Sequence, residues 1–236
     1  RSLVNDNITS LSVDEKYVWA ATEGGVGRYD KVADKWESYT VENQLPSNDV
    51  RAVDESETDV WIGTGNGISK HVIMSEDRNA WETYNAAIEV KPQIVSKEYA
   101  TSLAHDDVRC ITVAKDSVWV GTKQGVSLFN TSSGIWRNYT EKDGLASNTV
   151  SDIVINDGTV WFASGHGITV FNPLQDTWQT ITKADGLASN QITCIEFSNG
   201  SVWFGTFDSG VSVWNTENNS WKTFTQNDGL PHNSIL

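Results

Sequence analysis

The sequence predicts an all-β protein made of repeated four-stranded units, and two observations carry this prediction. First, a phrase of the form Val-Trp-x-Gly/Ala-Thr/Ser occurs five times in the 236 residues. Second, each phrase lies among short runs rich in Val, Ile, Trp, Phe, Tyr and Thr, separated by Gly, Asn, Asp and Ser, which is typical of strands and tight turns. The tryptophans of the phrase, at separations of 42, 58, 42 and 42 residues, are Trp19, Trp61, Trp119, Trp161 and Trp203.

Each repeat contains four such runs. In the third repeat the expected strands are 107–114, 117–122, 125–130 and 135–140. Four strands in about 42 residues leave room only for short hairpins, so each repeat is expected to be a four-stranded antiparallel sheet. This is the size of one blade of a β-propeller.

The phase of the repeat predicts one β-propeller domain at 1–236. The five complete blades are 3–44, 45–102, 103–144, 145–186 and 187–229, and 230–236 begins a sixth repeat or closes the ring. Propellers of ~4 to 8 blades exist, so five blades can form a ring. A fragment of a longer propeller, or protomers that complete one another, are the alternatives.

Positions that recur in every repeat are expected to serve the scaffold. A hydroxyl residue ends the phrase and a glycine follows it, as Thr64 and Gly67 do, so we expect a glycine with positive φ and a hydroxyl that caps the turn. Asparagines recur in the linkers and are expected to bind the backbone: Asn48, Asn148, Asn190 and Asn233. A second tryptophan recurs in the fourth expected strand of each repeat, as Trp36, Trp81, Trp136, Trp178 and Trp221. Ten of the 11 tryptophans therefore recur, and we expect them to pack between blades.

The order of these motifs carries a family resemblance. Gly-Leu-Pro/Ala-Ser-Asn-x-Val is followed by Val-Trp-x-Gly-Thr-x-x-Gly-Val and then by Trp and Tyr-Thr. This succession resembles the two-component regulator propeller repeat over essentially the whole chain. The resemblance implies a propeller of the kind found in periplasmic sensor regions of hybrid histidine kinases and in secreted or surface proteins. WD40 and kelch repeats fit less well, whereas virginiamycin B lyase repeats are similar in the Val-Trp-Phe region and imply an enzyme as an alternative.

The composition excludes some partners. A formal net charge of -14 and a pI near 4.6 oppose binding to nucleic acid or to anionic lipid. No apolar run approaches the roughly 18 residues that span a bilayer, so no membrane insertion is expected. The chain begins at Arg1 without a signal-like segment and resembles a mature or excised chain. Cys110 and Cys194 lie in one register of two non-adjacent repeats, which predicts free thiols.

Sequons of the form Asn-x-Ser/Thr permit an extracellular, cell-surface or periplasmic glycoprotein. The candidate glycosylation sites are Asn7, Asn130, Asn138, Asn199 and Asn218. Propeller topology places Asn130, Asn199 and Asn218 in hairpins between first and second or third and fourth strands, on what we call the hairpin side of each blade. The opposite side carries the linkers between blades and the turns between second and third strands, and we call it the linker side. Glycans on the hairpin side would leave the linker side free for contacts.

Residues that vary on the linker side are candidates for ligand binding. They change from blade to blade on a constant scaffold, and together they offer an aromatic ring, an imidazole, amides and carboxylates. Such a set suits a glycan or another small polar ligand. The candidates are Glu23, Asn66, Gln124, His166, Phe207 and Asp208.

The second repeat is longer than the others by 16 residues, most of them within 85–101. An insertion in one repeat forms a loop that is often on the binding face. Its apolar residues are candidates for a protein interface or for self-association: Ile88, Val90, Ile94, Val95 and Tyr99.

Signals for catalysis are few. The four histidines have no metal-ligand spacing, and no nucleophile or phosphate-binding motif occurs, so no catalytic residue, metal or cofactor is predicted. The sequence therefore favours a non-catalytic sensor or recognition module that binds a polar small molecule, a glycan or a protein. The alternatives are a self-assembling structural surface protein that uses the insertion in the second repeat, and an enzyme similar to virginiamycin B lyase.

Overall fold

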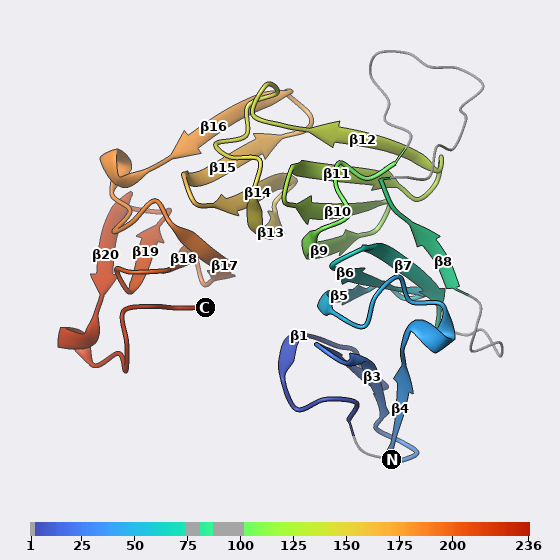
Figure 1. Cartoon of the computed structure of the whole chain (residues 1–236). Coiled ribbons are helices and arrows are strands. Elements are labelled where there is room, and N and C mark those ends of the chain that lie inside the picture. The colour runs from blue at the N-terminus through green and yellow to red at the C-terminus, as the bar shows by residue number, and fades with distance from the viewer. Residues whose placement is uncertain (1–2, 74–80, 87–101) are drawn as a thin grey trace. The chain divides into compact units, whose positions relative to one another are not determined.

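The computed structural model describes residues 3–73, 81–86 and 102–236, which form five four-stranded sheets (Figure 1). In every sheet the neighbouring strands are consecutive in the chain and run antiparallel. The prediction of an all-β fold of four-stranded antiparallel propeller blades is confirmed. In the third repeat, the expected strands agree with the observed ones to within one residue at each end.

The strands of the blades have the following bounds. Blade one contains β1 (Ile8–Val13), β2 (Tyr17–Thr22), β3 (Gly25–Asp30) and β4 (Lys35–Tyr39). Blade two contains β5 (Val50–Glu55), β6 (Asp59–Thr64), β7 (Gly67–Val72) and β8 (Trp81–Tyr84). Blade three contains β9 (Val108–Ala114), β10 (Ser117–Thr122), β11 (Gly125–Asn130) and β12 (Ile135–Tyr139). Blade four contains β13 (Val150–Asn156), β14 (Thr159–Ser164), β15 (Gly167–Asn172) and β16 (Thr177–Ile181). Blade five contains β17 (Ile192–Ser198), β18 (Ser201–Thr206), β19 (Val211–Asn215) and β20 (Ser220–Phe224).

The chain divides into two compact units, Arg1–Asn138 and Tyr139–Leu236. Blades one and two and nearly all of blade three belong to the first unit, and blades four and five belong to the second. Each unit is described by itself below. The assignment of 1–236 to one domain, with the blade boundaries given above, stays a prediction.

The turn between the second and third strands has the structure that the sequence predicts. In blade two, Thr64 Oγ1 donates to the Gly67 carbonyl at 2.9 Å and accepts from the Asn66 N–H at 3.1 Å. Gly67 has a φ of 108°, and a Cβ at this position would lie 2.6 Å from the Tyr84 carbonyl oxygen, so only glycine fits. The same hydroxyl-to-carbonyl bond occurs in the other blades as Thr22 to Gly25, Thr122 to Gly125, Ser164 to Gly167 and Thr206 to Gly210.

The linker asparagines bind the backbone, as expected. Asn48 Oδ1 accepts from the N–H of Val41 at 2.8 Å. Val41 begins a short 3-10 helix, Val41–Asn43, whose first free N–H groups need such an acceptor. The equivalent bonds in other linkers join Asn148 to Glu141, Asn190 to Lys183 and Asn233 to Gln226.

Side chains of each first strand bind the backbone of the next first strand within a unit. In the second unit, Ser151 Oγ donates to the Ile192 carbonyl at 2.8 Å, and Asp152 Oδ2 accepts from the Ile195 N–H at 2.8 Å. Burial raises the pKa of the Asp152 carboxyl. The corresponding bonds of the first unit join Thr9 to Val50 and Asp54 to Val113.

The core lies between successive blades. Trp161 of β14 packs with Ile195 of β17 in one buried cluster, and Phe197 meets the Trp161 ring edge-to-face at 5.2 Å. Trp203 is different, because it stacks on Phe224 of its own blade and keeps 39% of its surface exposed. The expectation that all ten repeat tryptophans are packed between blades is therefore wrong for Trp203. Trp203 lies in β18 and its stacking partner in β20, so this contact stays within blade five.

Both cysteines are free thiols, as the sequence indicates. Cys110 is buried in β9, and Cys194 is half-buried in β17.

Candidate functional site

Hollows occur on the hairpin side of the blades, between the first hairpins of successive blades. In the first unit, one of about 780 Å³ lies between blades one and two, and one of about 590 Å³ lies between blades two and three. In the second unit, a hollow of about 270 Å³ lies between blades four and five. These three hollows thus share one location, the junction of two first hairpins, whereas a smaller one of about 200 Å³ lies beside β16 and β20.

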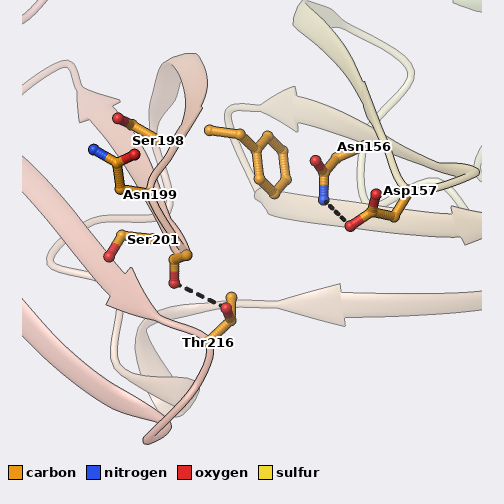
Figure 2. Close-up of a pocket in the computed structure, with 8 residues that line it drawn as sticks. Asn156, Asp157, Ser198, Asn199, Ser201 and Thr216 are labelled. Atoms are coloured by element: carbon orange, nitrogen blue, oxygen red, sulfur yellow. Dashed lines mark hydrogen bonds between the residues drawn. The ribbon is translucent and has the colours of Figure 1, made fainter.

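The hollow of the second unit is built by two tight hairpins (Figure 2). Asp157 and Gly158 join β13 to β14 with φ values of 47° and 76°, and Asn199 and Gly200 join β17 to β18 with 48° and 71°. Two central residues with positive φ define the type I′ turn, for which Asp-Gly and Asn-Gly are the preferred sequences. The local sequence therefore fixes the backbone of both walls.

Polar residues of the two hairpins line the hollow on opposite sides. Asn156 Nδ2 donates to Asp157 Oδ2 at 3.3 Å on the wall of blade four. On the wall of blade five, Thr216 Oγ1 donates to the Gly200 carbonyl at 2.9 Å (Figure 2). The remaining lining residues are Phe197, Ser198, Asn199 and Ser201.

Phe197 gives this hollow an apolar surface. Its ring is half-buried and is held edge-to-face against Trp161, with an interplanar angle of 82°. Hydroxyl, amide and carboxylate groups surround it. One aromatic surface with a few hydrogen-bonding groups is the usual composition of a site for a small polar ligand.

The two hollows of the first unit are acidic and share three residues in their walls, Glu55, Ser56 and Glu57. Burial, followed by the charge of Asp14, raises the pKa of the Glu55 carboxyl to about 7. Burial also raises the pKa of Asp54, which stands next to it on β5. Trp61 and Val113 add apolar surface to the hollow between blades two and three.

The ligand-binding residues expected from the sequence lie elsewhere, on the linker side. All six are exposed in the turns between second and third strands, and none lines the hollows described above. Asp208 is held by the hydroxyls of Ser189 and Ser209, which lower the pKa of its carboxyl. A ligand role for Glu23, Asn66, Gln124, His166, Phe207 and Asp208 stays a prediction.

Sequence reasoning missed the residues of the hairpin side. Asp157-Gly158 and Asn199-Gly200 are evident turn signals, but a turn signal does not show that two turns of successive blades enclose a space. The one available signal was the aromatic Phe197 at a position that other first strands fill with Val13, Glu55, Val113 or Ile155.

The candidate glycosylation sites differ in accessibility. Asn7, Asn199 and Asn218 are exposed, whereas Asn130 is half-buried at the end of β11. Asn138 is also half-buried, and its Nδ2, the atom to which a glycan would be attached, donates to the Ser102 carbonyl at 3.1 Å. Asn130, Asn199 and Asn218 lie in or next to hairpins on the hairpin side, as expected. Use of any sequon stays a prediction.

The interface candidates of the second repeat fall outside the described residues: Ile88, Val90, Ile94, Val95 and Tyr99. Within the described ranges, no group of three or more His, Cys, Asp or Glu side chains is arranged to hold a metal ion. The same part of the chain contains no helix of the length and apolar character needed to cross a membrane.

Similar solved structures share the propeller fold. The extracellular domains of two hybrid two-component systems from B. thetaiotaomicron match with TM-scores of 0.73 and 0.74 at 22% and 18% identity. The matches cover 92% and 97% of this chain but only 30% and 29% of those chains. Virginiamycin B lyase from Staphylococcus aureus matches with a TM-score of 0.66 at 15% identity, over 95% of this chain and 72% of the lyase.

Sequence comparison gives one match. No curated protein matches the chain. The sequence profile of the two-component regulator propeller family matches residues 186–208, which run from the linker glycine to the turn after β18. The resemblance that the motif order indicated is thereby confirmed. The chain is a β-propeller that carries a two-component regulator propeller repeat at 186–208.

Proposed function

We propose that this chain is a non-catalytic recognition module, of the kind that serves as the sensor part of a larger protein. Its ligand is a polar small molecule or a glycan, bound in the hollow between the β13–β14 and β17–β18 hairpins. The observation that carries this proposal is the lining of that hollow, where amides, hydroxyls and a carboxylate surround the Phe197 ring. These groups recognise a ligand by hydrogen bonds and ring contact.

The proposed location is extracellular or periplasmic. Two similar structures are extracellular domains of two-component systems, and the net charge of -14 suits a soluble sensor module. The chain spans about 30% of the length of those extracellular domains, and the signalling output would belong to other parts of the parent protein.

Thermal stability in the presence of a panel of neutral and acidic oligosaccharides tests the proposal. A ligand that binds the folded chain raises the melting temperature in a saturable way. In the double variant Asn156→Ala/Ser201→Ala the affinity should fall by about tenfold or more, since each lost hydrogen bond costs about 1 kcal/mol. Asp157→Asn retains a residue that tolerates positive φ and reports on the carboxylate alone.

His166→Ala is the matched control, because His166 is exposed in a turn of the same blade on the linker side. Unchanged affinity in this variant is expected. Binding that survives in the hairpin variants and disappears in His166→Ala would contradict the proposed site and move it to the linker side. Metal-dependent turnover of virginiamycin B would favour the enzyme alternative, for which the likeness to the lyase supplies only a shared fold.

A further inference from the structure

Glu55 occupies an unusual position at the junction of blades one and two. It is the last residue of β5, and its Oε1 accepts a hydrogen bond from the Ser12 hydroxyl of β1 at 3.2 Å. The other oxygen, Oε2, is shielded from solvent, and among the described residues it has no hydrogen-bond partner. A nearby donor is the indole N–H of the fully buried Trp19, which lowers the pKa of Glu55 by hydrogen bonding but is too poorly placed to satisfy either group by geometry. A carboxylate in this position is incompletely compensated.

The charges around Glu55 are mainly negative. Asp14 and Glu15 lie in the hairpin after β1, together with Lys16, and they line the same hollow as Glu55. Asp54 precedes Glu55 on β5. Further charged groups around the two hollows are Glu57 and Asp59 of the next hairpin and Lys115 after β9, and Arg28 of β3 lies over the Trp19 ring.

We propose that Glu55 makes the contact between the first hairpins of blades one and two dependent on protonation. The neutral carboxyl keeps Ser12 and the β1–β2 hairpin against β5. The ionised carboxylate is shielded from solvent, has one oxygen without a well-placed hydrogen-bond donor and is repelled by Asp14 and Asp54, so the β1–β2 hairpin separates more readily from β5. Because Glu55 belongs to the walls of both hollows of the first unit, their shape changes with pH.

The direction of the effect follows from linkage. Burial and neighbouring carboxylates raise the pKa of Glu55 from 4.5 to about 7. A group whose pKa is higher in the folded chain contributes stability that is fully present below the unfolded pKa. This contribution is lost as the pH rises through about 7. The junction is thus expected to be tightest in mildly acidic solution.

Hydrogen exchange at pH 6 and pH 8.5 measures this junction directly. The reporter is the amide of Val53 on β5, whose N–H donates across the junction to Ser10 Oγ of β1 at 3.3 Å. After correction for intrinsic rates, the protection of this amide should fall by about tenfold between the two pH values in the unmodified chain. The hairpin at Asn199 in the second unit serves as an internal reference whose protection should not change.

Glu55→Gln is expected to abolish this pH dependence, because the amide is neutral at both pH values. Glu57→Gln is the matched control, since Glu57 is exposed at the tip of the β5–β6 hairpin and lines the same hollows, and it should retain the full dependence. A carbon-13 titration of the Glu55 carboxyl in the unmodified chain gives a test that does not depend on how the variants fold. Titration near 4.5, or a pH dependence that persists in Glu55→Gln, would overturn the proposal.

Discussion

At the scale of single residues, the turn between the second and third strands is the most constrained part of each blade. In blade four, Ser164 Oγ donates to the Gly167 carbonyl at 2.9 Å and accepts from the His166 N–H at 3.2 Å. Gly167 has a φ of 115°, and a Cβ there would lie 2.5 Å from the Ile181 carbonyl oxygen. Both the hydroxyl and the glycine are therefore required by geometry, which explains why they recur.

This geometry predicts a sharp difference between two neighbouring glycines. Gly167→Ala should lower the free energy of unfolding by about 2 kcal/mol, because it combines positive φ with a backbone clash. Gly165→Ala should change it by less than about 0.5 kcal/mol, since a Cβ there meets nothing within 4 Å. Urea unfolding of the two variants measures both values. Equal effects would show that the turn is not strained in the way described.

At the scale of secondary-structure elements, the first strands hold successive blades together through side chains. Asp152 is the clearest case in the second unit. Its two carboxylate oxygens accept from the Ile153 and Ile195 N–H groups, each at 2.8 Å, and the second bond crosses from blade four to blade five. Side-chain acceptors of this kind replace the strand-to-strand ladder that is absent between blades.

Asp152→Ala removes an acceptor from the buried Ile195 N–H, which is expected to cost about 2 to 3 kcal/mol of unfolding free energy. Glu196→Ala is the control, because Glu196 is exposed on the partner strand and has no comparable bond among the described contacts. Chemical denaturation of both variants provides the measurement. A Glu196 variant as unstable as the Asp152 variant would argue against a role for the crossing bond.

At the scale of the whole molecule, the sequence predicted what depends on local pattern. The strands, the turns around Gly67 and the linker bonds of Asn48 follow from residues close in the chain, and the repeat supplies each signal four or five times. The exposure of Trp203 and the hollow beside Phe197 depend instead on what packs against a blade. The same motif can be buried or exposed according to that neighbour, so a repeated pattern alone does not show the difference.

The position of the ligand site is likewise a property of the whole molecule, because it depends on which side of the blades carries usable space. Residue variation favoured the linker side, where Gln124 and His166 lie in exposed turns. The described hollows favour the hairpin side, where Asn156 and Ser201 line opposite walls of a space of about 270 Å³. The two hypotheses name different residues and can be separated by one experiment.

Backbone amide chemical shifts of the 26.1 kDa chain, recorded during titration with an oligosaccharide that raises its melting temperature, test the central claim most directly. The account predicts that the largest shifts occur at 156–158 and 198–201, on the two hairpins that enclose the hollow. Shifts confined to the turns at 123–124 and 165–166 would contradict it and place recognition on the linker side.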